Sequence, residues 1–197
     1  MDGFTPVLWP EHTPPPEVAD CRRCELWKQR SRVIWGEGNP KAPVLIVLDN
    51  PGAREDREGK DFVCGVRQTL QAEAHRAGFA AEDMYVTYIL KCRPRYRYDK
   101  EAARGVCREF LLAQVREQQP QLAFCLGDTA VQWFFGDMDL SVKALRGRWH
   151  LVRGLPTAVS YHPLAVRRRP SLLRVFREDW ELLKRGDGSP ASNGADL

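Results

Sequence analysis

The sequence lacks the features of a membrane protein, a secreted protein and a disordered chain. Its longest apolar run, from Pro43 to Leu48, falls far short of the roughly 20 residues that a membrane-spanning helix needs. The N-terminus carries acids and prolines where a signal peptide would have a basic stretch and an apolar core. Of the 197 residues, 43% are hydrophobic and 28% charged, a composition that is typical of a globular protein. We therefore expect a cytoplasmic monomer with no membrane partner.

The order of apolar segments predicts a single α/β domain. Continuous apolar runs at Val44–Leu48 and Met84–Leu90 are typical of strands that are buried on both faces. Further strands are expected at Gln121–Leu126, Trp149–Val152 and Thr157–Ser160, and helices at Glu17–Arg30, Gly65–Ala77, Glu101–Gln118, Asp128–Phe135 and Ser171–Lys184. This alternation predicts a three-layer α/β/α domain over residues 17–185 with a central, mainly parallel four-stranded sheet. Residues 1–16 are expected to be an irregular lead-in, and residues 186–197 a disordered polar tail.

Six cysteines are present, and a disulfide framework is not expected in a reducing cytoplasm. Cys21 and Cys24 form a C-x-x-C, so two thiolates from one turn can reach a single metal centre. Cys92 and Cys107 lie in a second basic segment, and neighbouring Arg and Lys residues would lower the thiol pKa of all four cysteines. Two such pairs suit a tetrahedral zinc ion or an iron–sulfur cluster, and the alternative is a motif that binds nothing. The remaining two, Cys64 and Cys125, flank apolar residues and are interpreted as buried small hydrophobes.

The net charge of +4 conceals two strongly basic segments. Residues 141–185 contain eleven Lys or Arg against three Asp or Glu, and residues 91–108 contain seven against two. Clustered positive charge is expected of a protein that binds a polyanion, although arginine-rich solvated helices would look the same. In a parallel sheet, ligands bind beyond the carboxyl ends of the strands. The segments expected there are residues 49–52, 91–93, 126–129 and 160–163.

Five features in order resemble the uracil-DNA glycosylase superfamily, and most closely its iron–sulfur family 4. They are a C-x-x-C, a Pro-Gly motif, EDxxGxxFV, KCRP with a downstream cysteine, and a His-Pro motif before a basic segment. Here they are found in CRRC (21–24), LDNPGAREDREGKDFVCG (48–65), YVTYILKCRP (85–94) with Cys107, and YHPLAVRRRPSLLRVFREDW (161–180). The resemblance covers roughly residues 21–184 and implies base excision repair by hydrolysis of the N-glycosidic bond of uracil in DNA. It also implies a structural 4Fe–4S cluster on Cys21, Cys24, Cys92 and Cys107.

Two positions depart from the family 4 pattern. The family reads GEAPG or GEGPG where this chain has LDNPG (48–52), so Asp49 replaces a glutamate and Asn50 a small residue. Asn-Pro-Gly resembles instead the mismatch-specific and single-strand-selective branches, in which that Asn positions the attacking water. The family's Asn that hydrogen-bonds the Watson–Crick edge of uracil aligns with Tyr88, and a phenol cannot reproduce the paired donor and acceptor of an amide. The resemblance therefore leaves the preferred base open.

The resemblance gives each residue near the strand ends a role. His162 would sit against the base carbonyl that gains charge, and Asn50 would orient the water with Asp49 as the nearby carboxylate. Phe62 would stack on the flipped base, and Tyr88 would fill the pocket, read a different base or stack. The plainer alternatives are a hydrogen-bonded structural histidine, a strand-terminating Asp-Asn turn and a core phenylalanine.

The basic segment after His-Pro is expected to contact DNA. Its arginines would grip phosphates or enter the duplex behind the flipped nucleotide, although a run of arginines is ordinarily a solvated face. The residues concerned are Arg167, Arg168, Arg169 and Arg174. We favour a DNA glycosylase that acts on uracil or another deaminated base, in duplex or single-stranded DNA. The alternatives are a catalytically weak or inactive DNA-binding iron–sulfur protein of the same fold and a zinc-stabilised nucleic-acid-binding module.

Overall fold

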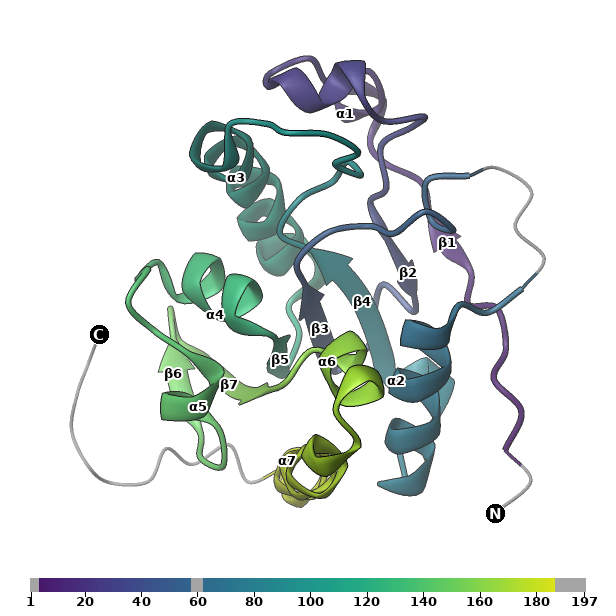
Figure 1. Ribbon diagram of the computed structural model, residues 1–197, viewed down its shortest axis with the longest axis vertical. Helices are drawn as coiled ribbons and strands as arrows, with labels where there is room; N and C mark the ends of the chain where they lie inside the picture. Colours follow the sequence, from purple (N-terminus) through teal and green to yellow (C-terminus); the bar gives the residue numbers. More distant parts are fainter. Residues whose placement is uncertain (1–3, 58–61, 187–197) are drawn as a thin grey trace.

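A computed structural model describes residues 4–57 and 62–186 and builds them around one mixed sheet (Figure 1). The strand order is β1-β2-β4-β3-β5-β7-β6. The strands are β1 (Glu11–His12), β2 (Gly36–Gly38), β3 (Val44–Leu48), β4 (Met84–Tyr88), β5 (Leu122–Leu126), β6 (His150–Val152) and β7 (Leu155–Ser160). Neighbouring strands among β4, β3, β5 and β7 are parallel, whereas β1, β2 and β6 join by antiparallel pairing. The α/β architecture and its parallel centre are therefore confirmed.

The predicted count of four strands is wrong, because the sheet has seven. Strands β1 and β2 are only two and three residues long, too short to show a periodic pattern in the sequence, whereas β6 matches the strand predicted at Trp149–Val152. Strand β2 reads GEG and was expected to be part of a turn. Its Gly36 lies so close to β4 that an added Cβ would stand 2.7 Å from the Val86 carbonyl oxygen. A glycine is needed there for close backbone approach, not for a turn.

Helices cover both faces of the sheet. They are α1 (Pro16–Ala19), α2 (Gly65–Arg76), α3 (Lys100–Gln118), α4 (Asp128–Phe135), α5 (Val142–Leu145), α6 (Pro163–Arg168) and α7 (Leu173–Arg185), with 3-10 turns at η1 (Glu25–Lys28), η2 (Ala81–Asp83) and η3 (Pro170–Leu172). One core cluster joins the sheet to α2, α6 and α7, and a second joins it to α3, α4 and α5. Ile46 of β3 belongs to the first cluster and its neighbour Val47 to the second, which explains the continuous apolar run.

A third apolar cluster forms a lobe at one end of the molecule. It contains Leu26, Trp35, Leu90, Cys92 and Cys107, with Cys21 and Cys24 packed against it. The predicted helix over Glu17–Arg30 is wrong, because this segment contains only short α1 and the 3-10 turn η1. Both elements are four residues long. The first ends before Cys21 and the second begins after Cys24, so the two cysteines lie in the break between them. Among the described residues, no helix is both long and apolar enough to cross a membrane.

The parallel strands bring four distant segments to one edge of the sheet. Because β3, β4, β5 and β7 run in the same direction, the residues after each of them lie together, as the sequence predicts. The Ile89 amide bonds to the Leu48 carbonyl, and the Gly127 amide to the Ser160 carbonyl, so the strand ends are tied to one another. This edge carries the candidate site.

Candidate active site

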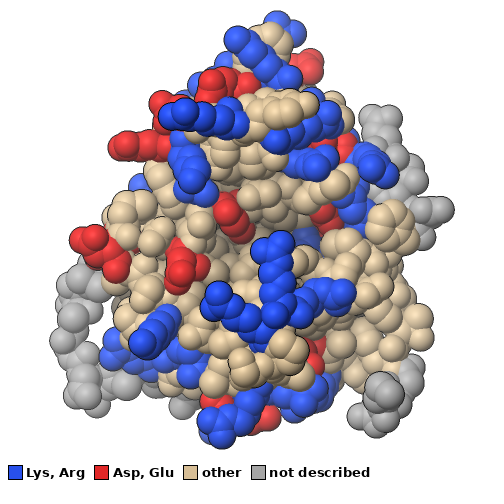
Figure 2. Space-filling view, viewed as in Figure 1, with Lys and Arg blue, Asp and Glu red and all other residues tan. Residues whose placement is uncertain are grey.

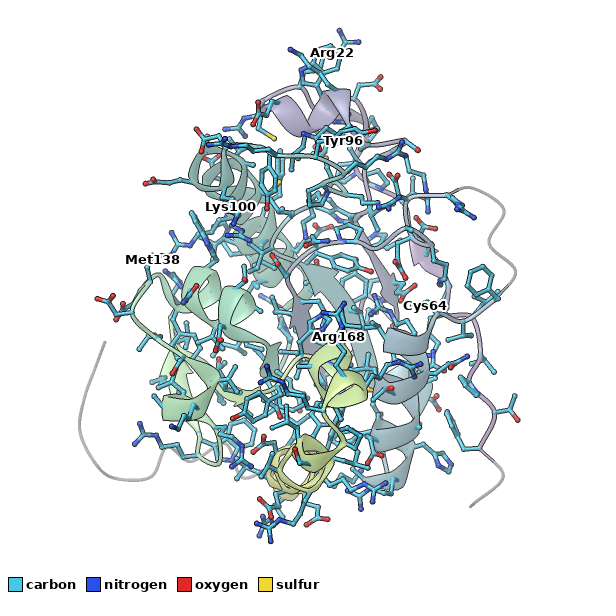
Figure 3. All side chains as sticks on the ribbon, in the orientation of Figure 1. Arg22, Cys64, Tyr96, Lys100, Met138 and Arg168 are labelled. Carbon is cyan, nitrogen blue, oxygen red and sulfur yellow. The ribbon has the colours of Figure 1, made fainter. Side chains whose placement is uncertain are left out.

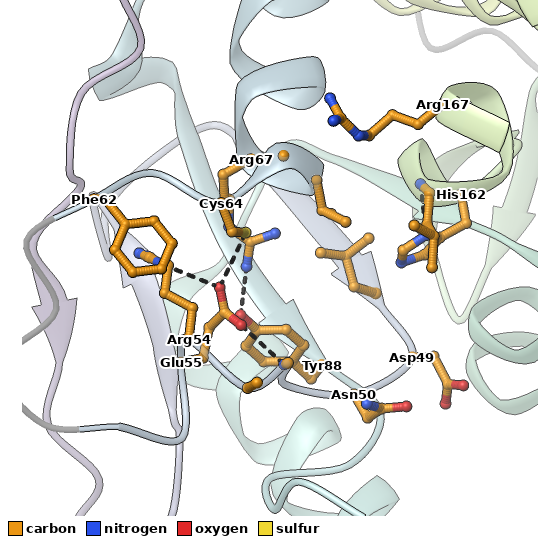
Figure 4. A pocket seen from close by; sticks show the side chains of 16 residues that line it. Asp49, Asn50, Arg54, Glu55, Phe62, Cys64, Arg67, Tyr88, His162 and Arg167 are labelled. Atoms are coloured by element: carbon orange, nitrogen blue, oxygen red, sulfur yellow. Dashed lines mark hydrogen bonds and ion pairs between the residues drawn. The ribbon is translucent and has the colours of Figure 1, made fainter.

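A cavity of about 670 Å³ opens at the carboxyl edge of the sheet, between the ends of β3 and β4 and the helices α2 and α6 (Figure 4). Six residues singled out from the sequence line it: Asp49, Asn50, Phe62, Tyr88, His162 and Arg167. These residues are separated by up to more than a hundred positions in the chain, so their convergence is a property of the fold. The cavity is also lined by side chains to which sequence analysis gave no role in the site, namely Arg54, Glu55, Cys64, Leu164 and Arg67.

The ring of His162 is held in one tautomer by the start of α6. Its Nδ1 accepts a hydrogen bond from the Leu164 amide at 3.1 Å, so His162 is the N-cap of that helix, and Pro163 takes the first helical position. A nitrogen that accepts a hydrogen bond carries no proton, and the proton of the neutral ring therefore lies on Nε2. Burial, followed by the charge of Arg67, lowers the pKa of His162 to about 4. At neutral pH this side chain is an uncharged hydrogen-bond donor.

The amide of Asn50 is oriented by its own loop. Its Nδ2 donates to the Pro51 carbonyl at 2.9 Å, which leaves Oδ1 as the atom that can accept a hydrogen bond from a water molecule. Asn50 is the second residue after β3, and it is half-buried in the cavity wall.

The carboxylate of Asp49 points away from Asn50 (Figure 4). It pairs with Arg104 at 3.4 Å and interacts with Thr129, on the side of a second cavity of about 290 Å³. Burial raises the pKa of Asp49, and the charge of Arg104 opposes that effect. Asp49 and His162 line both cavities, whereas Asn50 lines the larger one, so Asp49 lies at the boundary between the two spaces.

The floor of the larger cavity is a buried network of charged and polar groups. The Tyr88 hydroxyl accepts a hydrogen bond from Arg67, and Arg67 also forms an ion pair with Glu37 of β2. Arg54 adds a second ion pair to Glu37 at 3.6 Å and one to Glu55 at 3.4 Å. Burial raises the pKa of Tyr88 well above its usual value, so the phenol is neutral. Tyr88 lines the cavity and is itself buried.

Cys64 belongs to this site, and its interpretation as a buried small hydrophobe is wrong. The thiol is half-buried, lines the cavity and donates to Glu55 at 3.5 Å. Burial raises its pKa, with the Glu55 charge acting in the same direction. Cys125, by contrast, is buried in the second core cluster as expected.

The entrance of the cavity combines exposed apolar and cationic side chains. Phe62 is 55% exposed and Leu164 is 37% exposed, so neither is a core residue. Arg167 lies against Gly65 at the start of α2, where an added Cβ would stand 2.6 Å from the Arg167 guanidinium carbon. Its Nη1 donates to Thr69 at 3.4 Å. This arginine therefore bridges α6 and α2 beside the cavity.

The other predicted arginines lie on the surrounding surface. Arg168 and Arg169 are exposed, and Arg174 is exposed beside Glu178 at 3.6 Å. Figure 2 shows Lys and Arg side chains gathered over α6 and again over the upper part of the same face, with a hollow between the two groups. Figure 3 places Arg168 on the lower group and Tyr96 and Lys100 near the upper one. The hollow is thus bordered by positive charge on two sides.

The four cysteines of the two pairs converge in the terminal lobe. The thiols of Cys21, Cys24 and Cys92 all interact electrostatically with Cys107 or with one another. N–H groups surround the sulfurs: Arg30 donates to the Cys92 sulfur at 3.7 Å, and the Lys91 amide to the Cys107 sulfur at 3.5 Å. Four thiols with N–H donors inside an apolar cluster form a donor set that fits an iron–sulfur cluster.

The expected effect of the basic neighbours on these thiols is not found. Burial raises the pKa of Cys92 to about 12 and that of Cys107 to about 11, and it also raises the pKa of Cys24. Desolvation outweighs the nearby positive charges because the sulfurs lie in an apolar cluster. Within residues 4–57 and 62–186, no group of three or more His, Cys, Asp or Glu is arranged to hold a single metal ion.

Comparison with known proteins identifies the family. The model of the uracil DNA glycosylase superfamily matches residues 35–184, a region that includes every cavity residue described above. The chain belongs to this superfamily. It is 31% identical to a type-4 uracil-DNA glycosylase of Saccharolobus solfataricus over 177 residues, which cover 85% of this chain and 82% of that protein.

Two further members of the superfamily are similar to the same extent. The type-4 uracil-DNA glycosylase of Archaeoglobus fulgidus is 31% identical, over 84% of this chain and 87% of its own length. That of Thermotoga maritima is 32% identical, over 85% of this chain and 89% of its own length. The predicted resemblance to the superfamily, closest to family 4, is confirmed.

Proposed function

We propose that this protein is a DNA glycosylase that hydrolyses the N-glycosidic bond of uracil, or of another deaminated base, in DNA and so initiates base excision repair. The relatives named type-4 uracil-DNA glycosylase support the proposal. The observation that carries it is that one cavity is lined by both His162, with Nε2–H as a fixed donor, and Asn50, with Oδ1 as a fixed acceptor.

The reaction needs two kinds of stabilisation, and the cavity offers both. The base must be flipped out of the helix, and as the C1′–N bond breaks it keeps the bonding electrons while the sugar becomes oxocarbenium-like. His162 donates from Nε2 to the base carbonyl oxygen on which this negative charge gathers. Asn50 accepts a hydrogen bond from the water whose oxygen forms the new bond to C1′. The proton that this water loses balances the one taken up by the departing base anion.

The remaining predicted residues support this chemistry. Phe62 stacks on the flipped base at the entrance, a contact worth about 1–3 kcal/mol per base. Asp49 acts on the oxocarbenium ion through the electrostatic field, because its carboxylate is paired with Arg104 at the boundary of the two cavities. Arg167 binds a phosphate beside the cavity entrance, and Arg168, Arg169 and Arg174 bind phosphates farther out, so binding weakens steeply as salt rises.

We infer that Cys21, Cys24, Cys92 and Cys107 hold a 4Fe–4S cluster. When bound, the cluster would cross-link the N-terminal segment to the loop before α3, through Cys92, and to α3 itself, through Cys107. Each iron of such a cluster takes one cysteine thiolate, so the four sulfurs need not meet at one point as the ligands of a zinc ion must. Iron and sulfide in a stoichiometry of four each, with broad visible absorption, would support the cluster. Zinc without iron would overturn it in favour of the alternative metal.

Free thiols also suit a reducing compartment. All six cysteines are free, which is consistent with the cytoplasm that we propose as the location. A monomer stays the expected oligomeric state.

The test of the proposed function is release of the base from defined DNA. Single- and double-stranded oligonucleotides carrying uracil, hypoxanthine or xanthine are incubated with the purified protein, and abasic sites are cleaved and counted. We expect abasic sites in at least the uracil-containing strands. The absence of abasic sites from every substrate, with DNA binding retained, would favour a DNA-binding protein without catalysis.

A further inference from the structure

The base-facing amide of the family is replaced here by a tyrosine that is turned into the protein. Tyr88 is 2% exposed, and its hydroxyl oxygen accepts a hydrogen bond from Arg67. The Asn50 amide group is also occupied, since its Nδ2 donates to Pro51. Arg54, Glu55 and Cys64 also line the cavity, and among these polar groups the guanidinium of Arg67 is the one that holds the Tyr88 hydroxyl, at the position of the family amide.

Arg67 is locked in place from two sides. Its Nε forms an ion pair with Glu37, and its Nη2 donates to Tyr88, so that two of its three nitrogens have fixed partners. The side chain is 3% exposed. Burial is the largest single influence and lowers the pKa of Arg67, but the combined effects of Glu37, Tyr88 and Glu55 outweigh it and raise that pKa above its ordinary value. The guanidinium is thus permanently charged and has one orientation.

The third nitrogen faces the cavity. None of the described residues accepts a hydrogen bond from Arg67 Nη1. This atom is nevertheless not one of the fully buried atoms that lack a partner, so it is open to the cavity. Figure 4 shows the guanidinium between Tyr88 and the middle of the cavity. Its charge lowers the pKa of His162, so the two side chains share the same space. A base that accepts from His162 would also contact Arg67.

We propose that Arg67 is the residue that reads the base, accepting only one with a carbonyl oxygen where the undamaged base has an amino group. This inference rests on the proposed function. A guanidinium has N–H donors and no acceptor, whereas an amide side chain has both. It can donate to O4 of uracil, but it would leave the amino group of cytosine facing a donor. A site built in this way rejects the wrong group strongly, because buried polar atoms are then left unpaired.

The position explains why Tyr88 replaces the family amide. An amide discriminates by the orientation in which it is held, whereas Arg67 discriminates by its chemistry in any orientation that faces the base. Tyr88 then serves to position the guanidinium, whose carbon Cζ lies 5.5 Å from the centroid of the tyrosine ring. Deamination converts an amino group to a carbonyl, and a donor-only reader detects that change directly.

The experiment compares binding of two uncleavable oligonucleotides. They carry 2′-fluorodeoxyuridine or 2′-fluorodeoxycytidine at one position, and the readout is the ratio of their dissociation constants. The variants are Arg67→Gln, which supplies an acceptor, and Arg67→Lys, which keeps a donor-only cation. Arg177→Gln is the matched control, because it removes an arginine that pairs with Glu73 on the outer surface of α2 and α7.

We expect the preference for the uracil analogue to fall about tenfold or more in Arg67→Gln. Arg67→Lys should retain the preference while binding both oligonucleotides more weakly, and Arg177→Gln should behave as wild type. An unchanged ratio in folded Arg67→Gln would overturn the inference, since a purely structural arginine would weaken both complexes equally.

A second variant covers the case in which Arg67→Gln does not fold. Tyr88→Phe keeps the ion pair to Glu37 and removes the acceptor that fixes Nη2, so the preference should fall several-fold. A wild-type ratio in Tyr88→Phe, with no folded Arg67→Gln, would count against Arg67 as the reader, and so would loss of the preference in folded Arg67→Lys. The base-release assay separates the two proposals, because uracil release by the wild type stands even if the ratio never changes.

Discussion

The two walls of the cavity are built in opposite ways. On one wall, Asn50 and His162 are oriented by hydrogen bonds to the next residue or two along the chain. On the other, Arg67 depends on Glu37 and Tyr88, which are 30 and 21 residues away. The first wall consists of strand-end loops and the second of a buried ion network between a helix and two strands.

This difference separates chemistry from recognition. The local wall carries groups that must face a water molecule and a departing base, and each is neutral, so little reorganisation accompanies the reaction. The network wall carries permanent charge, which is costly to bury and is retained only with its partners in place. Damage to the first wall should therefore lower the rate with the fold intact, whereas damage to the second should affect stability and selectivity.

The largest effect is expected for the local wall. His162→Ala removes the donor to the base oxygen, and Asn50→Ala removes the acceptor for the water, so each should lower the rate of uracil release about 100-fold or more. Single-turnover release from a uracil-containing oligonucleotide measures this effect. His75→Ala is the control, since its exposed ring stacks on Phe4 at the other end of α2. Wild-type rates in both cavity variants would exclude this wall from the chemistry.

Glu37→Gln tests the network wall. It leaves the charges of Arg67 and Arg54 without their shared carboxylate, and breaking a buried pair in this way typically costs about 3–5 kcal/mol of unfolding free energy. Denaturant unfolding measures the loss. The matched control is Glu109→Gln, whose partner Arg23 is exposed, where a change below about 1 kcal/mol is expected. Equal losses in the two variants would contradict the importance of burial.

The same contrast explains what the sequence could predict. The parallel strands follow from continuous apolar runs, and the local wall follows from residues next to a strand end, such as Asn50 after β3 and His162 after β7. Arg67 has no local signal, because its partner Glu37 lies in a three-residue strand that resembles a turn. Only the packing of β2 against β4 and α2 brings these residues together.

The sequence indicated which cysteines lie together in the terminal lobe, but not the backbone structure of the segment that carries the first two. The four cysteines proposed as cluster ligands were singled out by their pairing and by the resemblance, and they lie in or against one apolar cluster. The helix expected over residues 17–30 fails because the lobe is organised by side-chain contacts with distant segments, including Arg30 to the Cys92 sulfur at 3.7 Å and Arg23 to Glu109 at 2.7 Å. The pKa direction of the thiols was missed for the same reason, since burial cannot be read from neighbouring Arg and Lys residues.

A smaller effect is expected at Asp49, whose carboxylate pairs with Arg104 and points away from Asn50. Asp49→Asn removes a charge already compensated by Arg104, so we expect a loss of uracil release of about tenfold, well below that of Asn50→Ala. The same single-turnover assay measures it, with Asp139→Asn on the exposed loop after α4 as the control. A loss as large as that of Asn50→Ala would show that Asp49 acts directly on the reacting atoms.

The smallest effect concerns the titration of His162, and it tests whether the two walls are independent. Because the folded pKa is about 4 and the ordinary value is 6.5, the unfolded chain takes up this proton first as the pH falls. The contribution of neutral His162 to stability is therefore present above about pH 6.5 and is lost as the pH falls from there toward 4. The difference in unfolding free energy between wild type and His162→Gln should change only within that window.

Nuclear magnetic resonance of the ring nitrogens links this titration to the network wall. In the wild type, the His162 ring should stay neutral, with its proton on Nε2, from pH 7.5 down to pH 5. Burial is the larger cause of the lowered pKa and the charge of Arg67 the smaller. In Arg67→Gln the pKa should consequently rise, yet stay below the ordinary value of 6.5. An unchanged pKa in that variant would mean that the two walls act separately, and a fully normal pKa would mean that charge, not burial, keeps the histidine neutral.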